Sequence, residues 1–304
     1  MTIAGDWEHR IGYQRDWVWR GWQIRYAYKR SQFENEKHYP PILLIHGFGA
    51  AIEHWRNNIG VLSQRHRVYA IDLLGFGASR KVYTNITVDL WVEQVYDFWR
   101  TFIGKPMILV GNSLGSLVSV VAAATHPEMV RGMAMLSLPD FSARAAVLPK
   151  WIQPIVDNIE RIFSSPIFIK PLFQVLRRPG VIRRWAGIAY YDQKAITDEL
   201  VAIIATPPLD EGADRTFCLL CQRVSNPDVF PSARTILANL DIPMLLVWGR
   251  QDRMIPFKLA PIIASLNPRI KLVELDQMGH CPQDEDPQRF NSILLEWLST
   301  IDNG

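Results

Sequence analysis

The chain has 304 residues, 48% of them hydrophobic, which suits one large α/β domain or one domain with an inserted subdomain. The formal net charge of +3 is too small to indicate a nucleic-acid binder, and three cysteines cannot form a disulfide framework. The odd cysteine count favours a reducing compartment, and the sequence shows no secretory signal pattern, so we expect a cytoplasmic protein. No apolar stretch of about 18 residues is free of charge, so we expect no membrane span.

Short, unbroken apolar runs recur along the chain. An aromatic-rich segment at 16–28 is interrupted by Gly21 and predicts a strand, a turn and a second strand. Further runs follow at 40–45, 67–72, 107–110, 133–136, 243–248 and 271–275. Such runs are typical of strands covered on both faces, and helical patterns such as 88–103 lie between them. Strands that alternate with helices predict an α/β fold, with a mostly parallel central sheet flanked by helices.

The alternation stops in the region from 140 to 232. This region has helical stretches and prolines but no convincing strand, and its segment 149–163 places apolar side chains on one helical face. We therefore expect a helical cap at 140–232, inserted into an α/β core formed by residues 1–139 and 233–304.

Residues 111–115, Gly-Asn-Ser-Leu-Gly, match the pattern G-x-S-x-G. In such an elbow the serine lies on a strained turn between a strand and a helix, and the glycines relieve steric clashes. An apolar run precedes this segment and a small-residue helical pattern follows it. This context predicts that Ser113 is a nucleophile, rather than an ordinary serine at a tight strand–helix junction.

A serine hydroxyl needs a base, and the base needs an acid that orients it. Asp252 follows the predicted strand at 243–248, and His280 follows the one at 271–275. Both therefore fall at the carboxyl ends of strands, where parallel sheets gather their active sites. The order Ser…Asp…His predicts Ser113 as nucleophile, His280 as base and Asp252 as acid. Asp276, four residues before His280, is the alternative acid.

The segment His46-Gly47-Phe48-Gly49 follows the predicted strand at 40–45. A tetrahedral intermediate needs two backbone N–H donors directed at its oxyanion. We assign one to Leu114, directly after the nucleophile, and the other to Phe48, whose flanking glycines let the backbone approach substrate. We expect His46 to hold this loop by hydrogen bonding, and His54, His66 and His126 to be surface or structural residues.

Taken together, HGFG, Trp55, DLLGFGAS at 72–79, GNSLG, GRQD and GH resemble the α/β-hydrolase superfamily in this order. Within it, segments 55–81 and 110–132 are similar to pheophytinase and chlorophyll-dephytylase-like hydrolases of plants and cyanobacteria. The resemblance implies a carboxylic ester hydrolase that works through an acyl-enzyme on a bulky lipophilic substrate, with the phytyl ester of chlorophyll or pheophytin as a candidate. This chemistry needs no cofactor and no metal, and we expect no nucleic-acid partner.

Two other functions stay open on the same fold. Carbon–carbon hydrolases of ring-cleavage products also use an elbow serine, and some proteins of this fold are ligand receptors with slow turnover. Dehalogenases and epoxide hydrolases are disfavoured, because they carry an aspartate at the elbow position that Ser113 occupies here. The oligomeric state is not determined by the sequence.

The predicted cap has an unusual charge balance. Residues 141–190 contain eight lysines and arginines but only two acidic residues, interleaved with large apolar side chains. The apolar residues could pack on the core with the basic ones solvated, or the cap could rest on an anionic membrane surface. Cys218 and Cys221 form a C-x-x-C pair without a second pair at metal spacing, so packing is the favoured interpretation.

Overall fold

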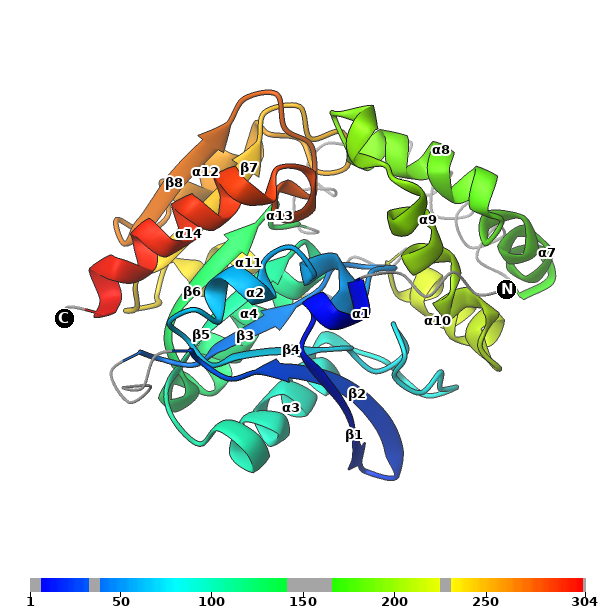
Figure 1. The fold of residues 1–304 in the computed structure, drawn as a ribbon, viewed down its shortest axis with the longest axis horizontal. Coiled ribbons are helices and arrows are strands. Elements are labelled where there is room, and N and C mark those ends of the chain that lie inside the picture. Colours follow the sequence, from blue (N-terminus) through cyan, green and yellow to red (C-terminus); the bar gives the residue numbers. More distant parts are fainter. Residues whose placement is uncertain (1–6, 33–38, 141–165, 225–230, 303–304) are drawn as a thin grey trace.

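The computed structural model describes residues 7–32, 39–140, 166–224 and 231–302. An eight-stranded sheet in the order β1-β2-β4-β3-β5-β6-β7-β8 runs through the molecule (Figure 1). The strands are β1 (Tyr13–Trp19), β2 (Trp22–Lys29), β3 (Ile42–Ile45), β4 (Val68–Ile71), β5 (Met107–Asn112), β6 (Val130–Leu136), β7 (Met244–Gly249) and β8 (Ile270–Leu275). Strand β2 pairs antiparallel with β1 and β4, and every other neighbouring pair is parallel. The expected strands and the mostly parallel α/β sheet are confirmed.

The central strands are apolar throughout because both faces of the sheet are covered. In β3, Leu43 and Ile45 pack into one core cluster, while Ile42 and Leu44 pack into the cluster on the opposite face. This alternation is the period of two that a strand imposes on its side chains. All four residues are fully buried, which accounts for an unbroken apolar run rather than an alternating one.

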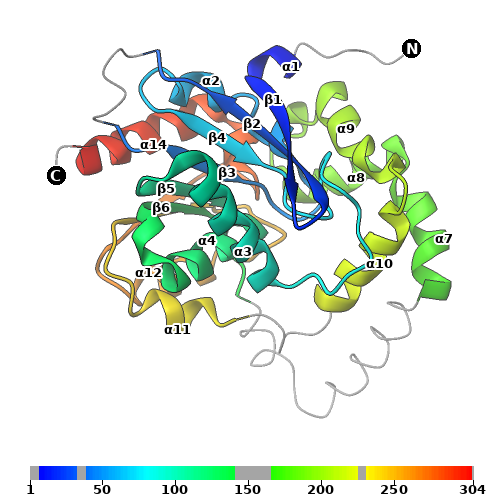
Figure 2. The same ribbon diagram turned by 90° about the horizontal axis from the view of Figure 1, so that it is seen from below.

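The helices of the core form one layer on each face of the sheet, as Figure 2 shows. Helices α3 (Val88–Phe98), α4 (Leu114–Thr125), α11 (Ala233–Leu237) and α12 (Leu259–Ala264) cover one face, and α2 (Ile59–Leu62) and α14 (Pro287–Asp302) cover the other. The remaining core elements are α1 (Trp7–Arg10), η2 (Ile52–Trp55), η3 (Trp99–Ile103), η4 (Pro127–Met129) and α13 (Pro282–Glu285). The helix expected at 88–103 is present, with its last turn, η3, widened to a π-helix.

Between β6 and β7, the described part of the chain is helical and contains no strand. Before the core helix α11, it forms α7 (Pro166–Leu176), α8 (Pro179–Ala189), η5 (Gln193–Ala195), α9 (Asp198–Ala205), η6 (Pro207–Leu209) and α10 (Ala213–Val224). These helices lie together at one side of the sheet (Figure 1). A helical insertion is thus present. Its expected first part, including the helix at 149–163, lies outside the described residues, so the cap bounds of 140–232 stay a prediction.

Candidate active site

Ser113 forms the turn between β5 and α4. Its φ of 52° and ψ of −114° lie in a region that residues with a side chain avoid for steric reasons. The two flanking glycines make this turn possible. A Cβ at Gly115 would lie 2.2 Å from the carbonyl oxygen of Ile45, and one at Gly111 would lie 2.3 Å from the carbonyl carbon of Gly115. The strained elbow that the pattern predicts is therefore present in the structure.

His280 and Asp252 are joined at this same edge of the sheet. Nδ1 of His280 lies 2.9 Å from Oδ2 of Asp252, and both residues are buried. The other carboxylate oxygen accepts hydrogen bonds from the backbone N–H groups of Met254 at 2.8 Å and Ile255 at 2.9 Å. A carboxylate only accepts hydrogen bonds, so Nδ1 of His280 is the donor in this contact, and in the neutral form of the ring Nε2 has the lone pair. This tautomer is the one that can take a proton from a hydroxyl group.

The structure separates the two candidate acids. Asp276 lies at the surface, where its Oδ1 accepts a hydrogen bond of 3.0 Å from the side-chain amide of Gln251. That bond, together with a backbone N–H, holds the pKa of Asp276 below its usual value. Asp252 is the carboxylate that lies against His280.

The loop that carries Phe48 presses directly on the elbow. A Cβ at Gly47 would lie 2.9 Å from Oδ1 of Asn112 and 3.4 Å from Cβ of Ser113. A side chain at position 47 would therefore have to displace the side chain of Asn112. Leu114 is the first residue of α4, and an N–H at that position has no acceptor within its own helix. Leu114 and Gly47, the residue before Phe48, thus lie beside Ser113, and Phe48 lines the same cavity as Ser113.

His46 holds this loop and is not a candidate base. Its Nδ1 lies 2.7 Å from the carbonyl oxygen of Gly47, and its Nε2 accepts a hydrogen bond of 3.0 Å from the N–H of Leu73. Complete burial lowers the pKa of His46 to about 4, so the ring is neutral. The expected hydrogen-bonding role agrees with these contacts.

Ser113 and His280 line one cavity of about 470 Å³ between the core and the insertion. Its wall is mostly apolar, with side chains from α7 and α8 facing the carboxyl edge of the sheet. The apolar lining residues include Phe48, Phe173, Leu176, Ile182, Trp185, Ala186, Ala189, Ile204, Phe217 and Met254. The cavity also contains Arg177 and His54 as polar wall residues.

His54 is a wall residue that the sequence pattern did not distinguish from a surface residue. It is only 6% exposed, and neither ring nitrogen has a hydrogen-bond partner in the part of the chain that the structure describes. Burial lowers the pKa of His54 to about 3, so a neutral imidazole lies in a mostly apolar wall. Its position on η2, just after the loop of Phe48, brings it to the cavity.

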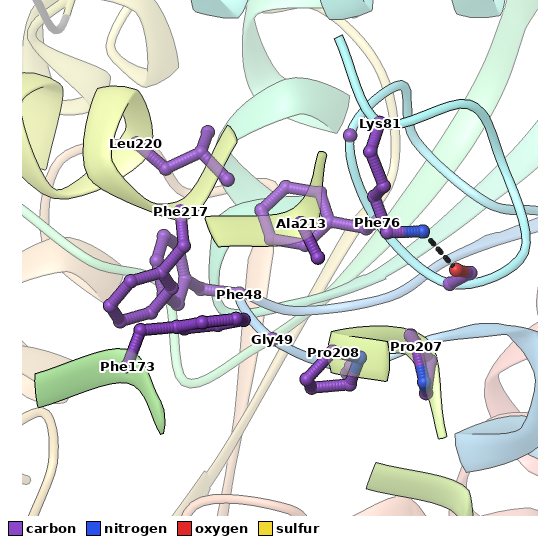
Figure 3. A pocket seen from close by; sticks show the side chains of 13 residues that line it. Phe48, Gly49, Phe76, Lys81, Phe173, Pro207, Pro208, Ala213, Phe217 and Leu220 are labelled. Atoms are coloured by element: carbon purple, nitrogen blue, oxygen red, sulfur yellow. Dashed lines mark hydrogen bonds between the residues drawn. The ribbon is translucent and has the colours of Figure 1, made fainter. Parts of the chain in front are cut away.

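A second, smaller cavity of about 70 Å³ adjoins the first. Phe48, Phe173 and Phe217 line both cavities, and Figure 3 shows their side chains close together. The ring centroids of Phe173 and Phe217 lie 5.0 Å apart. At one end, Nζ of Lys81 is bonded to the carbonyl oxygens of Gly77 and Ser79 and to the carboxylate of Asp210. Because its charge is already paired, Lys81 leaves this compartment apolar.

Among the residues that the structure describes, the site shows no arrangement for a metal. Within the described ranges, no group of three or more His, Cys, Asp or Glu side chains could hold a metal ion. Cys218 of the C-x-x-C pair is buried on α10, and burial raises the pKa of the Cys221 thiol to about 12.

In the part of the chain that the structure describes, no helix is both long and apolar enough to cross a bilayer.

Comparison with known proteins agrees with this geometry. The family model for the alpha/beta hydrolase fold matches residues 40–287. Chloroplastic pheophytinase of Arabidopsis thaliana is 24% identical over 93% of this chain and 66% of its own length, a little under two thirds. The 2-hydroxymuconate semialdehyde hydrolase of Pseudomonas sp. (strain CF600) is 26% identical over 86% of this chain and 88% of its own.

Solved structures show the same fold. A meta-cleavage product hydrolase from Pseudomonas fluorescens IP01 superposes with a TM-score of 0.73 at 22% identity, and the match covers 96% of this chain and 99% of that one. The family model spans most of the sequence and includes strands β3 to β8, the elbow and the paired histidine and aspartate. The chain therefore belongs to the α/β-hydrolase fold family.

Proposed function

We propose that this protein is a serine hydrolase that cleaves carboxylic esters through an acyl-enzyme. Ser113 is the nucleophile, His280 the base and Asp252 the orienting acid, and the amides of Phe48 and Leu114 bind the oxyanion. The observation that carries this proposal is the bond of 2.9 Å between His280 and Asp252, in a cavity that is also lined by a serine on a strained elbow.

The reaction uses the lone pair on Nε2 of His280 and the two backbone N–H donors. Nε2 of His280 takes the hydroxyl proton of Ser113 while Oγ of Ser113 attacks the ester carbonyl carbon. The carbonyl oxygen becomes an oxyanion, which the backbone N–H groups of Phe48 and Leu114 bind. When the intermediate collapses, the C–O bond to the alcohol breaks and His280 donates its proton to the departing oxygen. Water then attacks the acyl-enzyme by the same route, and Asp252 stabilises the imidazolium throughout without taking its proton.

The cavity supports a bulky lipophilic substrate. Its volume of about 470 Å³ and its apolar wall suit a bulky apolar group next to Ser113. The compartment behind Phe48 and Phe217 offers a second apolar space for a branch of that substrate. Together with the match to pheophytinase, these features support the phytyl ester of a chlorophyll pigment as the candidate to test first.

Turnover of p-nitrophenyl butyrate tests the class, and a panel of chlorophyll, pheophytin and simple esters tests the substrate. We expect multiple turnovers, and we expect Ser113→Ala to remove them while thermal unfolding stays unchanged. Full activity in Ser113→Ala would refute the assignment of the nucleophile. A single burst of product followed by ligand-dependent capture of a partner protein would favour a slow-turnover receptor instead.

Carbon–carbon bond hydrolysis is the second candidate. It is supported by the relative that is named a 2-hydroxymuconate semialdehyde hydrolase, and by Arg177 in the cavity wall, which could bind the carboxylate of a ring-cleavage product. Turnover of such a dienoate faster than that of any ester, with Arg177→Met raising its KM, would assign the protein to this class.

Exposed residues on α7 and α8 of the insertion support transient contact with an anionic membrane, which would suit a lipophilic substrate. Trp185 is 54% exposed and Leu172 45% exposed on α8 and α7, and the basic side chains of Arg178 and Arg184 are exposed on the same segment. Flotation with vesicles that contain phosphatidylserine tests this contact. We expect binding at low salt that is lost in Trp185→Ser, and no flotation of the unaltered protein would end the idea.

A further inference from the structure

One carboxylate joins the loop of the proposed base to the insertion. Oε1 of Glu285 accepts hydrogen bonds from the backbone N–H groups of Tyr191 at 2.9 Å and Asp192 at 2.7 Å, the second and third residues after α8. Oε2 accepts one of 2.9 Å from the N–H of Gly279, the residue before His280. Hydrogen bonds to a charged acceptor are about twice as strong as neutral ones. We refer to these three bonds of Glu285 as the clamp.

The two segments that the clamp joins are also in direct backbone contact. The N–H of His280 donates to the carbonyl oxygen of Ala189 at 2.7 Å. Ala189 is the last residue of α8, so its carbonyl oxygen receives no hydrogen bond from within the helix. The N–H of His280 supplies that hydrogen bond. A Cβ at Gly279 would lie 2.2 Å from the same oxygen and 2.8 Å from the nitrogen of Tyr191. No side chain fits between the loop and the helix end.

A chain of ion pairs, buried at Arg56 and Asp284, contacts the same helix end from a second side. The hydroxyl of Tyr190 donates to Oδ2 of Asp284 at 2.6 Å, and Oδ1 of Asp284 lies 2.8 Å from a guanidinium nitrogen of Arg56. Arg56 also pairs at 2.6 Å with Glu199 of α9, and Glu199 pairs with Arg10. Asp284 and Glu285 both lie on α13, immediately after His280. The segment that follows the base is therefore an attachment point for the helices of the insertion.

The backbone of His280 is thus placed by contacts from both sides of the cavity. Its carbonyl oxygen accepts a hydrogen bond of 3.0 Å from the side chain of Asn112 in the elbow, and its N–H is held by Ala189. The imidazole can reach Ser113 only if this backbone position is kept. A misplacement of about 1 Å in a catalytic geometry can cost roughly 100-fold in rate.

We propose that Glu285 is a positioning residue, which ties the His280 loop to the end of α8 so that the base and the helices of the insertion move as one body. This inference rests on the proposed function, because it assigns His280 as the base. It has a consequence for substrate selection: Ala189 and Tyr190 line the cavity, so a ligand that displaces them also displaces His280.

Glu285→Gln tests the clamp with little change in volume. One oxygen becomes an NH₂ group, which cannot accept, so at least one of the three backbone N–H groups then faces a donor. With p-nitrophenyl acetate, which is too small to need the insertion for binding, we expect kcat to fall 10- to 100-fold while KM stays within about threefold. Glu285→Asp keeps the charge but is one methylene too short to reach both segments, and we expect an intermediate loss.

Asp286→Asn is the matched control. It removes the same charge at the next residue. In the described part of the chain, the Asp286 carboxylate accepts one hydrogen bond, from the backbone N–H of Arg289. We therefore expect the activity of Asp286→Asn to stay within about twofold of that of the unaltered protein. A substrate-free measurement accompanies the kinetics: the proton NMR signal of Nδ1–H of His280, in its bond with Asp252. We expect this signal to broaden or vanish in Glu285→Gln and to persist in Asp286→Asn.

The outcomes separate the two proposals. Unchanged kcat and an unchanged His280 signal in Glu285→Gln would overturn the clamp and leave the esterase standing. Full ester turnover in Ser113→Ala would overturn the esterase, and the NMR signal would still decide on the clamp. If neither Glu285→Gln nor Glu285→Asp folds, Glu285 serves folding alone and the positioning role is overturned.

Discussion

Asp252→Asn should convert the proposed base into the wrong tautomer, and the surrounding hydrogen bonds explain why. Oδ1 of Asp252 accepts two backbone N–H groups, from Met254 and Ile255. In the variant the amide oxygen is therefore held at this position, and the NH₂ group faces His280. Because that group only donates, Nδ1 must become the acceptor and the ring proton moves to Nε2, which can then no longer take the proton of Ser113.

The magnitude follows from the alternative orientation. Turning the amide around would place its NH₂ group against two backbone donors, at a cost of about 1–3 kcal/mol for each buried group left without an acceptor. The wrong tautomer is thus strongly favoured. Loss of tautomer control in a triad of this kind lowers kcat by about 10⁴-fold, which corresponds to about 5 kcal/mol of transition-state stabilisation.

The assay is turnover of p-nitrophenyl butyrate by the unaltered protein, Asp252→Asn and the control Asp276→Asn, with thermal unfolding of each. Asp276 lies at the surface on Gln251, so we expect its variant to keep turnover within about twofold, because exposed polar contacts contribute little. A loss smaller than tenfold in Asp252→Asn, or a larger loss in Asp276→Asn, would refute the reasoning about the acid.

Three further substitutions test the packing around the site. Asp284→Ala leaves the guanidinium of Arg56 without one of its partners, and the Arg56 side chain is only 4% exposed. We expect the free energy of unfolding in urea to fall by about 3 kcal/mol. A change below about 1 kcal/mol would mean that the ion pair contributes little. Gly115→Ala places a methyl group 2.2 Å from a backbone oxygen and should destabilise the folded protein by about 3 kcal/mol. In the control Gly180→Ala, the added methyl group has no neighbouring atom within 4 Å, and we expect no loss of stability. Equal melting temperatures of the two variants would contradict this expectation. Phe217→Ala joins the two cavities and should raise kcat/KM for branched or long acyl esters relative to the acetate ester, and an unchanged ratio would show that substrate does not reach the smaller cavity.

Much of the fold could be predicted because it is encoded locally. A strand covered on both faces must be apolar at every position, so runs such as 40–45 and 107–110 indicate buried parallel strands without knowledge of their neighbours. The elbow is equally local, since the sharp turn at Ser113 requires small residues on both sides and a strand and a helix in fixed order. The chain order of nucleophile, acid and base then follows from the family pattern.

Tertiary structure alone decided which of the nearby polar residues reach the site. Asp252 and Asp276 both follow strands, and only the paths of their loops bring one to His280 and leave the other at the surface. The clamp of Glu285 is non-local in the same way, because its partners at the end of α8 lie 93 and 94 positions away in the sequence. Local patterns determine where a chain turns and which face is buried, but contacts between distant segments depend on how loops and inserted helices pack, and no short-range pattern encodes that packing.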